Sequence, residues 1–76
     1  MSWEVERMTQ ADLIRRYLDE KGSISPMEAF AELGITKLAT RISEMIRKGE
    51  RFQKIPEKGI NRYGGVVSYM RYKKAV

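Results

Sequence analysis

The chain of 76 residues contains neither cysteine nor histidine, and its 15 Lys and Arg against 10 Asp and Glu give a formal net charge of +5. Without Cys or His, disulfides, structural zinc sites and the usual acid/base side chain of neutral-pH catalysis are excluded. No apolar stretch approaches the roughly 20 residues that cross a bilayer, and residues 1–6 lack the segments of a signal peptide. We therefore expect a soluble cytoplasmic protein with one small domain in residues 9–73, an N-terminal arm in 1–8 and a C-terminal tail in 74–76.

The charge is distributed unevenly along the chain. Up to Gly34 there are four basic and seven acidic residues, a net charge of −3, and from Ile35 onward there are eleven basic and three acidic residues, a net charge of +8. Such an excess presents a positive surface, and nucleic acid is the commonest polyanion. The alternative is a solvated basic surface with no partner.

The first predicted helix begins after Thr9. Thr9 is a good N-cap with Asp12 as its capping-box partner, and Gly22 ends the helix. One apolar face recurs at helical spacing, formed by Leu13, Ile14, Tyr17 and Leu18.

A short extended link and a second helix follow. Residues 23–25 are predicted to be extended and available as a minor strand. Ser25, Pro26 and Glu28 then combine an N-cap, a proline in the first turn and a capping-box glutamate. Gly34 ends this short helix.

The third predicted helix covers about residues 37–48, with Thr36 as its N-cap and Gly49 as its end. Its inward stripe consists of Leu38, Ile42, Met45 and Ile46. The tight break between Leu33 and Thr36 makes the two helices cross steeply, with Ile35 between them. This arrangement is a helix-turn-helix.

The remainder of the chain predicts a β-hairpin. Phe52 and Ile55 lie in a basic first strand in which Pro56 indicates an edge or a bulge, and residues 66–72 read as the second strand. Lys58 and Arg62 are placed near the tip. The turn is marked by Gly59, Asn61, Gly64 and Gly65, and fraying is expected at Lys73, Lys74, Ala75 and Val76.

The stretch from Asp12 to Tyr72 resembles the small winged helix-turn-helix domains of phages and prophages. The resemblance rests on residues 22–30, Leu33-Gly34-Ile35, residues 38–42, Lys48-Gly49 and residues 61–64. It implies an α+β fold with three helices, a short strand between the first two, a C-terminal hairpin wing, and DNA binding. Phe30 departs from the pattern of simple three-helix repressors, which usually have a small alanine there, so base contacts cannot be transferred from them.

Geometry supplies the candidate contacts of the third helix instead. With the apolar stripe inward, the centre of the opposite face carries Thr36, Thr40 and Arg47. A helix in the major groove reads bases with its N-terminal side chains, which makes Lys37, Thr40, Arg41 and Glu44 the candidate readers. For Glu44 the alternative is an ion pair with Arg41, Arg47 or Lys48.

The wing, about residues 54–65, is predicted to contact the DNA backbone or the minor groove. Lys54, Lys58 and Arg62 are its candidate phosphate or minor-groove contacts. Tyr63 stacks on the wing or lies against a sugar. Two aromatic predictions lie outside the wing: Tyr69 and Tyr72 belong to the sheet and core, and Trp3 with Val5 covers the core or anchors a second subunit.

The sequence contains no pattern typical of catalysis. It has no nucleophile–base pair and no GxxxxGK[ST] phosphate loop, so we predict no enzyme, no cofactor and no metal. The predicted function is sequence-specific binding of duplex DNA, as a transcriptional regulator or an architectural, excisionase-like factor of a mobile element. The alternative is a protein–protein adaptor that uses the same scaffold without DNA, and a homodimer is left open.

Overall fold

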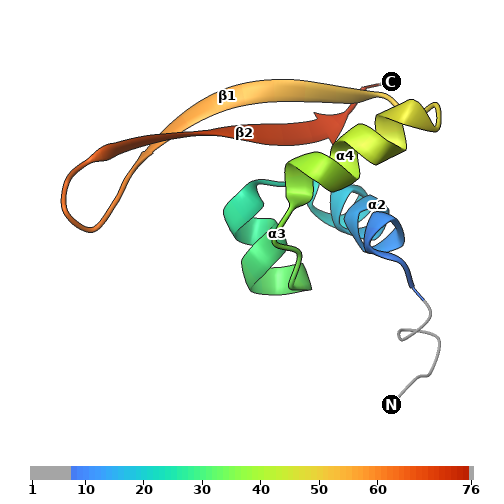
Figure 1. Ribbon diagram of the computed structural model, residues 1–76, viewed down its shortest axis with the longest axis horizontal. Helices are drawn as coiled ribbons and strands as arrows, with labels where there is room; N and C mark the ends of the chain where they lie inside the picture. The colour runs from blue at the N-terminus through green and yellow to red at the C-terminus, as the bar shows by residue number, and fades with distance from the viewer. Residues whose placement is uncertain (1–7, 76) are drawn as a thin grey trace, which may run out of the picture.

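The computed structural model describes residues 8–75 and consists of three helices followed by a long antiparallel hairpin (Figure 1). The elements are α2 (Gln10–Lys21), α3 (Pro26–Leu33), α4 (Leu38–Arg47), β1 (Phe52–Ile60) and β2 (Val66–Lys74). The predicted α+β order is confirmed. The predictions for Trp3 and Val5 lie outside the described residues.

The first two helices begin and end at the predicted residues. Thr9 and Asp12 form a complete capping box at α2, and Ser25 and Glu28 form another at α3 with Pro26 in its first turn. Gly22 ends α2 in the left-handed conformation, at φ 88°. Each capping box satisfies two backbone N–H groups that the first turn would otherwise leave without a partner.

The start of α4 differs from the prediction. Thr36 is not the N-cap: that position falls to Lys37, which makes no side-chain capping bond. Ile35 and Leu38 are both buried, at 1% and 3% exposure. Lys37 has φ −125° and ψ 61°, outside the helical region, so the helix begins one residue later than the capping pattern indicates.

Strands β1 and β2 pair antiparallel over nine residue pairs, from Phe52–Lys74 to Ile60–Val66. Gly59 therefore lies in β1, not in the turn as predicted. The prediction that Lys73 and Lys74 fray is also wrong, since both are paired in β2.

The predicted minor strand is present as a single bridge. Ile24 and Tyr72 exchange two backbone hydrogen bonds of 2.8 Å, so the backbone groups of Tyr72 point away from β1. Positions two residues apart share this direction, and Met70, the partner of Pro56, is such a position. Pro56 thus sits where its missing N–H would face outward, which explains why the ladder tolerates it.

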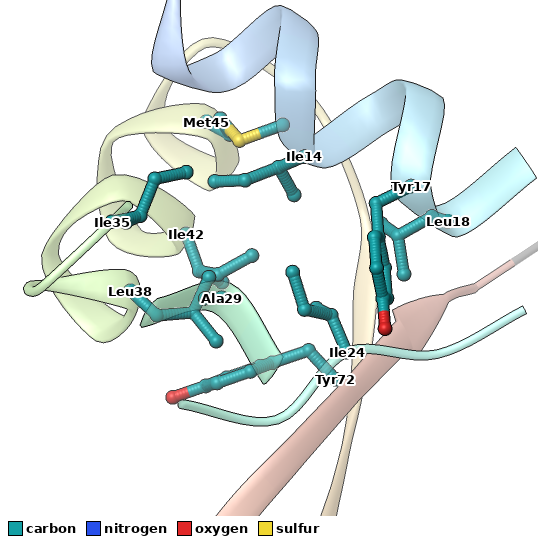
Figure 2. Packing of buried hydrophobic residues seen from close by; sticks show 10 residues of the cluster. All are labelled: Ile14, Tyr17, Leu18, Ile24, Ala29, Ile35, Leu38, Ile42, Met45 and Tyr72. Carbon is teal, nitrogen blue, oxygen red and sulfur yellow. The ribbon is translucent and has the colours of Figure 1, made fainter. Parts of the chain in front are cut away.

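The core lies between the helices and the base of the hairpin (Figure 2). Ile14 of α2, Ile42 of α4 and Ile24 of the link are each at most 1% exposed, and Tyr72 of β2 is 6% exposed. Ile46, predicted in the inward stripe, is 39% exposed. At 100° per residue it lies to one side of the stripe formed by the three buried positions of α4, and the adjoining structure leaves that side open.

Polar contacts tie the base of the hairpin to the helices. Arg71 donates to Glu57 across the hairpin at 3.0 Å, to Glu28 of α3 at 2.9 Å and to the Ser23 hydroxyl at 3.1 Å. At the end of β2, Lys74 reaches Asp19 of α2 at 3.2 Å. The proximal half of the hairpin is therefore part of the folded body.

Candidate nucleic-acid interface

The outer face of α4 carries side chains that extend into solvent. Thr36, Lys37, Thr40 and Arg47 are all exposed, Thr36 in the turn before the helix and Arg47 in its last turn. None of the four has a side-chain hydrogen bond to another residue of the 8–75 stretch. Lys37 is thus a free cation at the N-terminal end of the helix, the end that reads bases in helix-turn-helix proteins.

Arg41 and Glu44 lie on one flank of α4 and bind each other. The guanidinium of Arg41 donates to the Glu44 carboxylate at 2.7 Å, and their side chains are 33% and 42% exposed. This is the ion pair that the sequence offered as the alternative for Glu44. The Nε atom of Arg41 is buried and has no hydrogen-bond partner within the described chain.

The wing side chains divide between the base and the tip of the hairpin. Lys54 lies opposite Tyr72 at the base, whereas Lys58 lies opposite Ser68 towards the tip, and both are exposed. Arg62 lies in the turn, with its guanidinium carbon 5.9 Å from the centre of the Tyr63 ring. Tyr63 is 87% exposed, so apart from this cation–π contact its ring is free to meet a ligand.

The carboxylates of the described chain are all engaged. Each of the eight Asp and Glu side chains in residues 8–75 makes a hydrogen bond, seven of them to Arg or Lys and Glu32 to the Tyr17 hydroxyl. Nine cations have no ion-pair partner in the same range, and all nine are exposed: Lys21, Lys37, Arg47, Lys48, Arg51, Lys54, Lys58, Arg62 and Lys73. The described carboxylates are thus paired within the domain, whereas the surplus cations have no partner there and face solvent.

Three of the free cations on or next to the hairpin were not predicted as site residues from the sequence. Lys48 and Arg51 flank the turn between α4 and β1, and Lys73 lies near the end of β2. Their place in a dense run of basic residues was the available signal. It could not show which cations would be neutralised, because the partners Glu28 and Asp19 are distant in sequence.

The ion pairs also shift titration. The pKa of the Glu50 carboxyl is lowered because it accepts hydrogen bonds from Arg15, and that of Glu57 is lowered mainly by its bond from Arg71. The bond to Glu32, with burial, raises the pKa of Tyr17 to about 12. The shifted pKa values therefore belong to side chains whose bonds join different elements of the fold.

The described residues offer no metal centre. No cluster of three or more Asp or Glu side chains that could hold an ion occurs within residues 8–75. The helices of these residues all lack the length and apolar character that a membrane span requires. The chemistry available on the outer face of α4 and on the wing is that of cations, hydroxyls and one exposed aromatic ring, which suits a polyanion with groove edges.

Comparison with known proteins agrees with this geometry. A family model described as a winged helix-turn-helix domain matches residues 9–73. No curated protein and no solved structure matches the chain. With three helices, a bridging strand and a hairpin wing in the order of that fold, and a match over nearly its whole length, the chain belongs to the winged helix-turn-helix domain family, whose fold is typical of DNA-binding modules.

Proposed function

We propose that this chain binds duplex DNA sequence-specifically, with α4 in the major groove and the wing on the flanking backbone or minor groove. The observation that carries the proposal is the imbalance of free charge. Every carboxylate in residues 8–75 has a partner, while unpaired cations lie at both ends of α4 and along the hairpin. Such a surface attracts phosphates by charge and by release of counterions.

The residues of α4 divide into base readers and backbone contacts. Lys37 and Thr40 lie at the N-terminal end, where Lys37 can donate to the acceptor edge of guanine. Arg47 lies seven residues after Thr40, near the C-terminal end of α4, where it can bind a phosphate of the DNA backbone. Arg41 and Glu44 enter as a pair that must open before either side chain reaches a base edge, guanine for Arg41 and cytosine for Glu44.

The wing supplies contacts that position the protein. Lys54, Lys58 and Arg62 are exposed and without carboxylate partners among the described residues. They suit phosphates, and Arg62 at the tip also suits a narrow minor groove. Tyr63 beside it can lie against a sugar. In the cell, we place this activity in the cytoplasm as that of a transcriptional regulator or an architectural, excisionase-like factor of a phage or other mobile element.

Selection from a random pool of duplex DNA tests the proposal directly. We expect a preferred sequence, and we expect Lys37→Ala to weaken binding to it by about 1 to 3 kcal/mol and to relax the preference at one position. Lys21→Ala is the matched control, because Lys21 is an exposed, unpaired lysine on α2. If Lys37→Ala and Arg41→Ala both bind like the wild type, α4 does not read the DNA.

A second function, as a protein adaptor, is favoured by exposed apolar groups on α3. Met27 and Phe30 are 73% and 58% exposed and lie three residues apart on this helix. Met27 also lines a groove with Ile60 and Val67 of the hairpin. Failure of every duplex in the pool to bind at low salt would contradict DNA binding and leave the adaptor, and sizing of the purified chain would show whether it is a homodimer.

A further inference from the structure

Ile60 lines the groove between the hairpin and Met27 of α3, and from there the far end of the wing projects past the helices (Figure 1). The last pair of the β-ladder is Ile60 opposite Val66, and these residues are 77% and 69% exposed. Directly opposed residues of an antiparallel pair share one face, so the two side chains form a single apolar pair next to the turn. Such a pair can stabilise the hairpin by packing across the strands, and that role would not require both side chains to be so exposed.

Alternation along the strands places a cation on the same face. Lys58 is two residues before Ile60 in β1, so both side chains lie on the side that Tyr72 shows to the core. Gly59 and Val67 form the adjacent pair on the opposite face. The apolar pair is thus followed, on its own face, by an exposed lysine.

The turn that joins the two strands is fixed by its own hydrogen bonds. The Asn61 side-chain oxygen accepts from the backbone N–H groups of Tyr63 and Gly65, both at 2.9 Å. The Asn61 N–H also donates to the Gly65 carbonyl at 2.9 Å. A Cβ at Gly65 would lie 2.9 Å from the Asn61 amide nitrogen, so the Asn61 side chain packs closely against this glycine. A tip held in this way loses little conformational freedom when it meets a ligand.

Charge selects the ligand of the tip. Residues 58–68 contain Lys58 and Arg62 and no acidic residue. A second copy docked tip to tip would bring like charges together, which is unfavourable. The minor groove of DNA is lined by phosphates, and proteins that bind there insert Ile, Leu, Met, Phe or Pro between base steps beside Arg and Lys contacts.

We propose that Ile60 and Val66 form an apolar wedge that enters the minor groove, partly unstacks a base step and bends the duplex, while Lys58 and Arg62 hold the adjacent phosphates. This inference rests on the proposed DNA binding and adds an activity to it. A flexible pyrimidine–purine step is the favoured point of entry, because such steps unstack most easily. The wedge makes the protein an architectural factor whatever sequence α4 reads.

Ring closure of short DNA tests the wedge with a defined probe. A linear duplex of about 100 base pairs of mixed sequence with cohesive ends is shorter than the persistence length of about 150 base pairs, so ligase closes it poorly unless it is bent. We expect the wild-type chain at saturation to raise the rate of ring closure about tenfold or more. The double variant Ile60→Ser/Val66→Ser should lose most of this gain while retaining binding.

Val67→Ser is the matched control, because it makes the same change one residue away on the opposite face of the hairpin. It should bend DNA as the wild type does, and circular dichroism should show all variants folded. Wild-type binding without faster ring closure overturns the wedge and leaves the proposed function standing, as does full bending by the double variant. Absence of any DNA binding overturns both.

Discussion

The two halves of the hairpin have opposite roles. In the proximal half, Tyr72 is buried in the core and Arg71 bonds three partners, two of them outside the hairpin. In the distal half, Ile60, Tyr63 and Val66 are each more than two-thirds exposed. The same ladder of backbone pairs runs through both halves, so the difference arises from the side chains and from the backbone bridge between Ile24 and Tyr72. The proximal half holds the hairpin on the helices, and the distal half is left available for a ligand.

The largest difference in stability is expected when an isoleucine is shortened to alanine in the core and in the distal half of the hairpin. Ile42→Ala removes a side chain that is 1% exposed and should lower the free energy of unfolding by about 2 to 5 kcal/mol. Ile60→Ala makes the same change at the tip and should alter it by about 0.5 kcal/mol or less. Urea denaturation followed by circular dichroism measures both changes. Comparable losses of stability would contradict the different roles of the packed and the exposed region.

The polar attachment of the base gives the next largest effect. Arg71→Met keeps much of the aliphatic stem but removes the guanidinium from Glu28, Glu57 and Ser23, and we expect a loss of about 1 to 3 kcal/mol. Lys73→Met is the control, because this exposed neighbour on the same face has no partner in the described chain. Equal stability of the two variants in urea would show that the contacts of Arg71 contribute nothing net.

Acid should weaken the ion pairs at the base of the hairpin, because their carboxylates become protonated. The pKa values of Glu50 and Glu57 are lowered below the ordinary 4.5, so their bonds to Arg15 and Arg71 contribute stability fully above about pH 5. This contribution is lost as the pH falls through the lowered values. Denaturation midpoints between pH 6 and pH 2 should fall, and Glu50→Gln/Glu57→Gln should flatten that dependence. An unchanged slope in the double variant would contradict the assignment.

The smallest effect is expected when a single cation of the turn, Arg62, is removed. Arg62→Ala should leave stability unchanged and lower DNA affinity by about fivefold, with the sequence preference retained, because a contact to phosphate carries no base information. Binding of the variant to preferred and scrambled duplexes measures this. A changed preference would mean that the wing reads bases.

Local signals predicted most of the fold. The capping boxes at Thr9 and Ser25 and the turn glycine Gly34 act within a few residues, and the structure has them as predicted. The errors occur where distant contacts decide. Thr36 does not cap α4, where its neighbours Ile35 and Leu38 are both buried in the core. Lys74 is held in β2 and bonds Asp19, more than fifty residues earlier.

The candidate site was predictable in outline only. Helical periodicity placed Lys37 and Thr40 on the outer face of α4, where both are exposed. Periodicity could not show that Arg71 would form ion pairs with Glu28 and Glu57 while Lys58 has none among the described residues. That outcome depends on the strand register and on the position of α3. The exposed pair at Ile60 and Val66 likewise follows from the register, which places the turn after Ile60.

The salt dependence of DNA affinity tests the central claim most directly. If about five phosphates are neutralised by the free cations of α4 and the wing, the plot of log affinity against log salt has a slope of about −4 to −5. Lys58→Ala/Arg62→Ala should make it less steep by about 2. A wild-type slope near zero, or a slope that the double variant leaves unchanged, would contradict the account.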